Sequence, residues 1–311
     1  CFCSTAPCAP FLECAGGKGL HSATPIRISL ASSGLPHCAC GPAWLKDLSS
    51  NMSPTKTIPS PGEPFSFKVL TANIHKGFSP LNRSFMLHDL RDAVRKVSAD
   101  VVFLQEVQGS HIKHATRVAN FPQTPQYEFL ADSIWSQFAY GRNAIYDHGH
   151  HGNALLSKFP ITHFENHNIS IKKKKKRGML HCVMQVPGRA TTIHAICVHL
   201  SLAENHRRKQ LALMCQMVRR DIPDDAPLIV AGDFNDWRNR THPFLERELG
   251  LKEVFVSATG HAARTFPARM PMLQLDRIYV RNAAVHAPMV LPGRPWSHLS
   301  DHAPLAAYID L

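Results

Sequence analysis

The stretch PLIVAGDFN, residues 227–235, joins an unbroken apolar run to two polar side chains, Asp233 and Asn235. Short runs of this kind, rich in Val and Ile, are typical of strands whose two faces are both buried. A carboxylate at the end of such a run is costly to bury unless it is paired or bound to a metal. We therefore expect a buried strand here that ends at a functional site.

Apolar runs of similar composition lie before and after this stretch in the sequence. Further strands are predicted at FKVLTANI (67–74), VVFLQEV (101–107), NALLS (153–157), GMLHCVMQV (178–186), TTIHAICVHL (191–200), LDRIYV (275–280) and PLAAYIDL (304–311). Helical spacing of apolar residues predicts helices over 87–99 and 204–222, and Arg207 and Arg208 on the second helix are expected to face solvent. Many strands with fewer helices indicate one large α/β domain with mixed sheets.

Polar side chains recur where these strands end. They are Asn73, Glu106, His199, Asp233, Asn235, Asp301 and His302. Any one of them alone would more often be a helix cap or a turn residue. Seven of them at strand ends, all able to serve one reaction, are harder to explain in that way, and loops at strand ends are where α/β proteins place their sites.

The residue types fit the hydrolysis of a phosphate ester. Glu106, Asn73 and Asp301 offer oxygen ligands, which suit a hard cation such as Mg²⁺, with Mn²⁺ as an alternative. Asp233 and Asn235 are two residues apart, so in an extended chain both side chains face the same way. One of them can orient a water while the other donates a hydrogen bond to a phosphate oxygen.

The histidines complete this chemistry. His199 and His302 can donate hydrogen bonds to charge that develops on the phosphoryl group. Asp276, at the start of its strand, can accept from an imidazole N–H and hold the ring in place. The sequence contains neither a P-loop nor a GxSxG nucleophile motif.

With these residues in view, the chain resembles the endonuclease/exonuclease/phosphatase superfamily, whose fold is DNase I-like. The matching segments occur in the family's order and cover residues 67–311: LTANIHKG (70–77), VVFLQEV (101–107), HHGNALLSKFPI (150–161), CVHLS (197–201), HRRKQ (206–210), LIVAGDFND (228–236), LDRIYV (275–280) and LSDHAPL (299–305). The resemblance implies an α/β (α+β) four-layer sandwich, in which two packed mixed β-sheets are flanked by helices and the site lies at one end of the sheets.

The resemblance also implies roles for the candidate residues. Asn73, Glu106 and Asp301 belong to the metal site; Asp233 aligns or deprotonates the attacking water; Asn235 and His199 contact the scissile phosphate; His302 stabilises the transition state or transfers a proton and is oriented by Asp276; and Asn153 contacts the substrate. At position 199 the abasic-site endonucleases typically carry Tyr, so the His argues against an abasic-site repair enzyme.

The first part of the chain differs from the rest. Six of the nine cysteines lie in the first 40 residues, without the spacing of common zinc fingers. We expect residues 1–64 to be a disordered or non-native segment, with a possible true start at Met52, and residues 65–311 to be the catalytic domain. The cysteines of that domain are expected to be buried thiols in a reducing compartment, which favours a cytoplasmic location. No apolar run reaches about 18 residues, which excludes a transmembrane helix.

The net charge of +12 makes an anionic partner worth considering. Residues 52–311 carry +11, and six of those charges belong to the run Lys172–Arg177. This run can contact phosphate backbones or anionic lipid, or it can be a solvated hairpin loop without aromatic residues for base stacking. Two further features are open: the histidines at 148, 150 and 151 suit a second metal or a surface loop, and Trp237 with Arg238 suits substrate contact or packing.

Taken together, the sequence predicts a monomeric, divalent-metal-dependent hydrolase of phosphate esters, most readily a phosphodiesterase. Its substrate is either a nucleic acid or a phospholipid headgroup or other small phosphate ester. A nuclease should present a basic groove with stacking aromatics, and a lipid enzyme often carries an exposed apolar hairpin, which the sequence does not reveal. The alternative from another class is a non-catalytic module that binds a phosphorylated ligand.

Overall fold

The computed structural model of the 311-residue chain describes residues 64–132, 134–171 and 176–311. The expectations for the N-terminal segment and for Lys172 to Lys175 fall outside these residues, so they stay predictions. Within the described ranges, no helix is long and apolar enough to cross a membrane.

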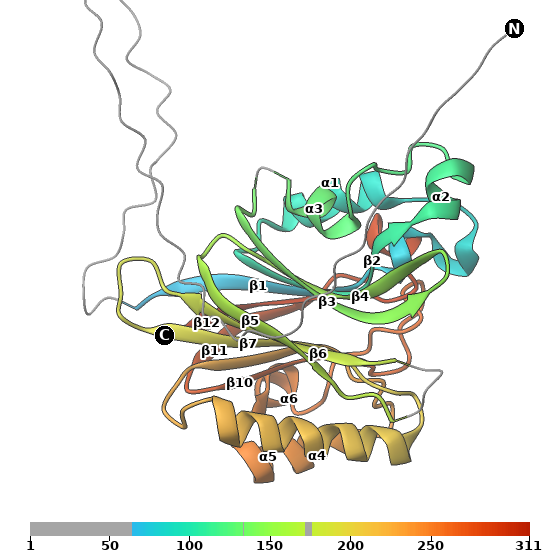
Figure 1. Cartoon of the computed structure of the whole chain (residues 1–311). Coiled ribbons are helices and arrows are strands. Elements are labelled where there is room, and N and C mark those ends of the chain that lie inside the picture. The colour runs from blue at the N-terminus through green and yellow to red at the C-terminus, as the bar shows by residue number, and fades with distance from the viewer. Residues whose placement is uncertain (1–63, 133, 172–175) are drawn as a thin grey trace, which may run out of the picture. The chain divides into compact units, whose positions relative to one another are not determined.

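Two six-stranded sheets form the centre of the domain (Figure 1). The first has the order β11-β12-β1-β2-β4-β3, with strands β1 (Ser66–Asn73), β2 (Val101–His111), β3 (Gln137–Tyr146), β4 (Gly149–Ser157), β11 (Ala284–Val290) and β12 (Leu305–Asp310). The second has the order β5-β6-β7-β8-β10-β9, with strands β5 (Ile161–Asn168), β6 (Gly178–Gln185), β7 (Thr192–His199), β8 (Leu228–Asp233), β9 (Lys252–Glu253) and β10 (Asp276–Arg281). β1 and β2 pair in parallel, as do β7 and β8, while the other pairs are antiparallel, so both sheets are mixed.

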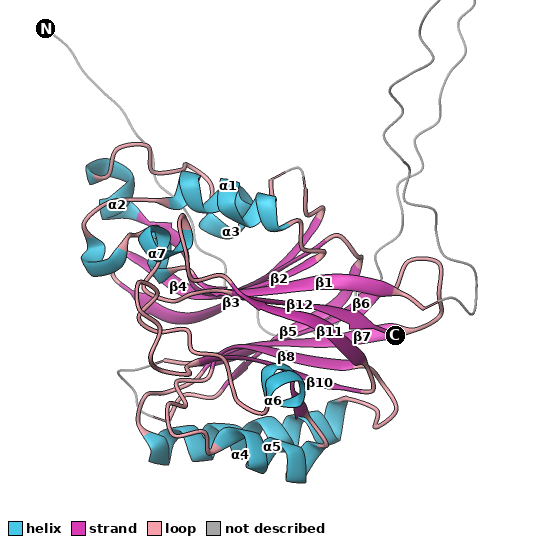
Figure 2. Cartoon of the chain, turned by 180° about the vertical axis from the view of Figure 1, so that it is seen from behind, coloured by secondary structure: helices cyan, strands magenta, loops and turns pink. Residues whose placement is uncertain are grey.

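Helices cover the outer faces of the two sheets (Figure 2). On the side of the first sheet lie α1 (Leu87–Val97), α2 (Ile112–Arg117), α3 (Gln126–Ala131) and α7 (Trp296–Leu299), and the 3₁₀ turns η1 (His75–Gly77) and η2 (Pro80–Asn82) follow β1. On the side of the second sheet lie α4 (Glu204–Asp221), α5 (Thr241–Leu249) and α6 (Val254–Thr259). The predicted four-layer sandwich is confirmed.

The side-chain alternation of the strands explains the layers. In β1, Phe67 and Val69 belong to the apolar cluster between the sheets, whereas Leu70 and Ala72 belong to the cluster under α1. Because successive side chains of a strand point to opposite faces, a strand buried on both faces reads as a continuous apolar run. β8 behaves in the same way, with its alternate residues packed toward the first sheet or toward α4.

All ten strands and helices predicted from the sequence are present, with ends that differ by a few residues. The sequence did not predict β3, β5, β9 and β11, or the helices α2, α3, α5, α6 and α7. β3, β5, β9 and β11 lie at the edges of the sheets, and three of them are largely exposed, so they lack a continuous apolar run. The cysteines of the domain, Cys182, Cys197 and Cys215, are buried free thiols as expected.

Candidate active site

The predicted polar residues come together at one end of both sheets. Pairing registers align Asn73 with Gln105, next to Glu106, in the first sheet. In the second sheet Asp233 is aligned with both His199 and Asp276. The loop before β12 supplies Asp301 and His302, and it is tied to β1 because the Ser300 hydroxyl donates to the backbone oxygen of Asn73 over 2.7 Å. The candidate site therefore lies where the ends of the two sheets meet.

Asp233 lies at the centre of this group and is 2% exposed. Its Oδ1 accepts a hydrogen bond of 2.9 Å from the backbone N–H of Asn235, and its Oδ2 accepts one of 3.3 Å from Asn73 Nδ2. His199 Nε2 lies 3.5 Å from the same Oδ2 atom. One carboxylate thus joins residues from both sheets.

Gly232, the residue before Asp233, allows the ends of β7 and β8 to approach each other closely. Its φ of 145° is a conformation that other residues rarely adopt, and a Cβ at this position would lie 2.0 Å from the backbone oxygen of Val198. Only glycine fits between the paired ends of β7 and β8. The Gly-Asp pair in the stretch 227–235 therefore fixes both the close approach of the strands and the position of the carboxylate.

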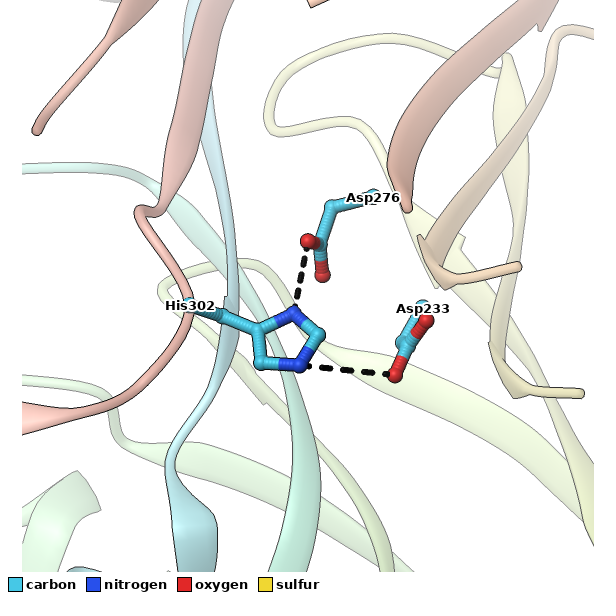
Figure 3. A group of neighbouring side chains, drawn as sticks. All are labelled: Asp233, Asp276 and His302. Carbon is cyan, nitrogen blue, oxygen red and sulfur yellow. Dashed lines mark hydrogen bonds and ion pairs between the residues drawn. The ribbon is translucent and has the colours of Figure 1, made fainter. Parts of the chain in front are cut away.

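His302 lies between two carboxylates (Figure 3). Its Nδ1 is 2.8 Å from Asp276 Oδ2, and its Nε2 is 4.0 Å from Asp233 Oδ2. The ring of Phe266 packs beside His302, with 5.1 Å between the two ring centroids. The geometry matches the predicted role of Asp276 as the residue that orients His302.

The charges of this trio favour a proton on the imidazole. Burial by itself lowers the pKa of His302, but Asp276 and Asp233 outweigh burial and raise that pKa. Burial raises the pKa of Asp233, His302 lowers it and Asp276 raises it again, with a net increase. Asp233, Asp276 and His302 lie close enough to hold an ion together. A protonated imidazole has no lone pair for a metal, so we interpret the trio as a proton-transfer group.

His199 and Asn235 lie on either side of Asp233. Burial lowers the pKa of His199 well below its usual value, and the nearby charge of Arg177 adds to this effect, so the ring is neutral. Asn235 Nδ2 donates to the backbone oxygen of Leu200 over 3.0 Å. Since an amide nitrogen carries two protons, one N–H of Asn235 remains for another acceptor.

The predicted metal ligands offer a donor set that fits a hard cation. Asn73 Nδ2 is used by Asp233, which orients the amide so that its Oδ1 faces the backbone N–H of His75 at 3.1 Å. Asp301 is partly exposed, and its Oδ1 lies 3.5 Å from His75 Nδ1. Together with the Glu106 carboxylate these side chains supply oxygen ligands, as Mg²⁺ and Mn²⁺ require.

Glu106 already faces a cation in the protein. Lys76 Nζ is 2.8 Å from Glu106 Oε2. Burial raises the pKa of Glu106, but the effects of His199 and Lys76 outweigh burial and lower that pKa from 4.5 to about 2. Because His199 is itself neutral, we attribute the ionised state of Glu106 mainly to Lys76. Glu106 also has a φ of 57° at an irregularity in the pairing of β2 with β4, the kind of backbone strain that clusters at functional sites.

Asn153, the predicted substrate contact, is bonded to the backbone of the neighbouring sheet. It is buried, and its Nδ2 donates to the backbone oxygens of Gly178 and Cys197 over 3.1 and 3.2 Å. These bonds tie β4 of the first sheet to β6 and β7 of the second. Contact of Asn153 with a substrate stays a prediction.

The structure adds Arg177 to the site. The sequence placed this residue only in a basic run, but its Nε lies 3.4 Å from the backbone oxygen of Leu200. Burial lowers the pKa of Arg177, whereas the charges of Asp233 and Glu106 raise it in part, and the charge of Arg177 in turn lowers the pKa of His199. The signal in the sequence was its place beside Gly178, at the start of a predicted strand, where the long lysine run obscured it.

One expectation was wrong. Arg208 is exposed as predicted, but Arg207 is 2% exposed and does not face solvent. Its Nη1 donates to the backbone oxygens of Ser201 and Leu202, and its Nη2 lies 3.4 Å from Asp236 Oδ1. Asp236 is fully buried, and its other oxygen accepts from the backbone N–H of Thr241 over 2.7 Å. Arg207 thus supports the two loops that follow His199 and Asp233.

The fold and this arrangement of residues define a class of phosphoester hydrolases, and comparison with known proteins agrees. The model of the endonuclease/exonuclease/phosphatase family matches residues 70–302, and the chain belongs to this family. Members of the family hydrolyse phosphoester bonds and typically depend on a divalent metal. Over 254 residues, 82% of this chain and all of the relative, it is 56% identical to the uncharacterized protein YbhP of Escherichia coli K12. The protein of the same name from Shigella flexneri matches equally well.

Solved structures share the fold at low sequence identity. An endonuclease/exonuclease/phosphatase from Beutenbergia cavernae superposes with a TM-score of 0.61 at 18% identity, over 79% of this chain and 72% of that one. D. rerio TDP2 in complex with a single-strand DNA product gives 0.59 at 19% identity, over 79% of this chain and 99% of that one. At these identities the likeness shows the fold alone.

Proposed function

We propose that this protein is a divalent-metal-dependent phosphodiesterase that cleaves its substrate by direct attack of water on phosphorus. The observation that carries the proposal is the position of Asp233. This carboxylate faces His302, which Asp276 holds at 2.8 Å, and it also contacts His199 and Asn73. A base, proton donors and oxygen ligands for a metal therefore converge in one site, whose centre, Asp233, is buried.

Each residue of the site has a chemical task in this reaction. Asp233, whose pKa burial raises, is suited to accept a proton from the attacking water near neutral pH. His302 carries the proton that stabilises charge on the phosphoryl oxygens and that can pass to the leaving oxygen. Asn235 and the neutral His199 hold other oxygens of the phosphoryl group through N–H groups.

Positive charge from the protein, and from a metal when one is bound, would compensate the rest of the negative charge on the phosphate. The Arg177 guanidinium, whose Nε lies 3.4 Å from the backbone oxygen of Leu200, next to His199, is suited to neutralise a phosphate oxygen. Glu106, Asn73 and Asp301 would hold Mg²⁺ or Mn²⁺, and the bound ion would supply Lewis-acid stabilisation of negative charge in the reaction. The solved structure of D. rerio TDP2 with a single-strand DNA product shows one ligand class that binds this fold, and it leaves the substrate of the present chain open.

Turnover of bis(p-nitrophenyl) phosphate, compared with p-nitrophenyl phosphate, tests this proposal. We expect the diester to be cleaved in Mg²⁺ or Mn²⁺, with activity lost in EDTA and restored by adding the metal back. The monoester should be cleaved more slowly. Full activity after exhaustive EDTA treatment would contradict the metal dependence, and a strong preference for the monoester would contradict the diesterase assignment.

The protein contains a matched control for His302. His286 Nδ1 lies 2.8 Å from Asp310 Oδ2, the same separation as in the His302–Asp276 pair, but both residues are partly exposed and Asp310 pairs with the start of β1, at the opposite end of the sheet. We expect His302→Ala to lose diester turnover by at least about 100-fold, and His286→Ala to stay within about twofold of the unmodified protein.

A further inference from the structure

Exposed apolar side chains gather at the catalytic end of the sheets. Twelve large apolar side chains are exposed in the described part of the chain, and nine of them lie on segments that follow β1, β2, β7 and β8, end β3 or precede β10. These nine are Leu81, Ile112, Ile145, Tyr146, Leu202, Trp237, Met270, Met272 and Leu273. Scattered apolar residues are normal on a surface, but a concentration at one end marks an interaction site.

A short hairpin at residues 266–273 carries three of these side chains, Met270, Met272 and Leu273. Phe266 and Leu273 form an isolated β-bridge, and the backbone N–H of Met272 donates to the oxygen of Phe266 over 2.9 Å. At its tip Met270 is 65% exposed and Met272 is 54% exposed. The base of the hairpin packs on the site through the ring of Phe266, beside His302.

The hairpin is also tied to the loop that carries Asp301 and His302. The backbone N–H of Ala268 donates to the oxygen of Asp301 over 2.8 Å, and that of Ala303 donates to the oxygen of Thr265 over 2.8 Å. A surface that contacts Met270 and Met272 is thereby held at a fixed position relative to the catalytic histidine.

Three more apolar side chains stand on loops next to the site. Leu202 follows His199 by three residues and is 62% exposed, and Trp237 follows Asn235 by two residues and is 47% exposed. Leu81 is 74% exposed and lines, with Arg83 and Arg269, a groove of about 430 Å³ between the loop after β1 and the hairpin. We call Leu81, Leu202, Trp237, Met270 and Met272 the apolar rim.

Exposed cations stand among the residues of the apolar rim. Arg83 and Arg269 are each within two residues of a rim side chain and form no ion pair with a described carboxylate. The guanidinium of Arg238 lies 4.5 Å from the ring centroid of Trp237, and both Arg238 and Arg240 contact Glu204. Apolar side chains with interspersed basic ones suit the boundary between headgroups and acyl chains of an anionic membrane.

We propose that the apolar rim docks on an anionic phospholipid surface and presents the phosphodiester of a lipid headgroup to Asp233 and His302. The proposal rests on the phosphodiesterase function and names its substrate class. The composition of the rim distinguishes lipid from nucleic acid. Proteins bind single-stranded nucleic acids by stacking the bases on aromatic side chains. Four of the five residues of the apolar rim are Leu or Met, which have no ring. Aliphatic side chains and one Trp partition into a lipid interface instead.

Flotation of the full chain with lipid vesicles tests the docking surface. The vesicles contain phosphatidylcholine alone or with roughly one third phosphatidylglycerol. The test variant is Met270→Glu/Met272→Glu, and the matched control is Phe164→Glu/Leu213→Glu, which adds the same charge at exposed apolar residues away from the rim. We expect the protein to float with the anionic vesicles, the test variant to bind them at least about tenfold more weakly, and the control to bind like the unmodified protein.

Bis(p-nitrophenyl) phosphate turnover and binding of a single-stranded oligonucleotide are measured on the same samples. Absence of diester turnover in the unmodified protein would count against the phosphodiesterase function, whatever the vesicles show. Equal vesicle binding by the test variant and the unmodified protein would overturn the docking surface. The same holds if the test variant loses oligonucleotide binding and keeps vesicle binding, because the rim would then serve a nucleic acid.

Discussion

At the scale of single residues, the chemistry depends on the carboxylate on each side of His302. Asp276 fixes Nδ1 at 2.8 Å, and Asp233 faces Nε2. Each carboxylate stabilises the imidazolium, and the imidazolium in turn opposes the effect of burial on Asp233. His302 therefore keeps a proton that it can donate to the substrate, and Asp233 remains able to accept a proton from the attacking water. Hydrolysis by direct attack requires both functions.

The His302–Asp276 pair predicts how the activity depends on pH. His302 acts as a donor only while it is protonated, so activity should fall as the pH rises through its raised pKa. In Asp276→Asn the main cause of that increase is removed, and the alkaline limb of kcat/KM should move to lower pH by about one unit or more, with a loss of kcat. The pH profile of diester turnover measures this shift. An alkaline limb at the same pH in Asp276→Asn and in the control Asp310→Asn would contradict the role of Asp276.

At the scale of secondary-structure elements, the junction of β9 and α6 contains a buried acid that the reaction does not use. Glu253 is fully buried, and its Oε2 caps α6 by accepting from the backbone N–H of Val256 over 2.6 Å. Burial raises the pKa of Glu253 from 4.5 to about 7. The cap positions α6 against β10, but it places a charge in the protein interior at high pH.

Because Glu253 binds its proton more tightly in the folded protein than in the unfolded chain, the stability of the protein depends on pH. Between pH 4.5 and about 7 the folded protein keeps the Glu253 proton while the unfolded chain releases it, so the free energy of unfolding falls as the pH rises and levels off above 7. Relative to the unmodified protein, Glu253→Gln should gain about 3 kcal/mol between pH 4.5 and 8. Urea unfolding at both pH values measures this gain, with the exposed Glu246→Gln as control. A Glu253→Gln difference that is the same at both pH values would show that the pKa is not raised.

The elements also show what could be predicted from the sequence. β1 and β8 could be predicted because both of their faces are buried, which leaves a continuous apolar run in the sequence. β5 could not, since its side chains are mostly exposed and carry no such run. The burial of Arg207 could not be predicted either, because it depends on Asp236, 29 residues away in sequence, and on the loops that the two residues join.

At the scale of the whole molecule, the site exists only where the two sheets meet. Asn73 from the first sheet donates to Asp233 from the second, and Asn153 joins β4 to β6 and β7. The strand ends could be predicted to form a site, and the core residues of that prediction do converge. Arg177 and the apolar rim could not, because their roles follow from where loops without periodic sequence come to lie.

The same architecture predicts that metal binding stabilises the fold. Glu106 and Asn73 lie on adjacent strands and Asp301 lies on the loop before β12, so a cation held by all three binds the folded chain and not the unfolded one. Mn²⁺ at 100 times its dissociation constant should raise the free energy of unfolding by about 2.7 kcal/mol. Thermal unfolding with and without Mn²⁺ measures the effect, and Glu106→Gln should reduce it. An equal increase in Glu106→Gln would place the metal elsewhere.

The central claim is that Asp233 activates the water that attacks phosphorus, and kcat/KM for bis(p-nitrophenyl) phosphate in Asp233→Asn tests it most directly. The Asn side chain keeps the size of Asp233 but cannot accept the proton, so we expect a loss of at least about 1,000-fold with an unchanged circular dichroism spectrum. A folded Asp233→Asn protein whose kcat/KM stays within about tenfold of the unmodified value would contradict the account.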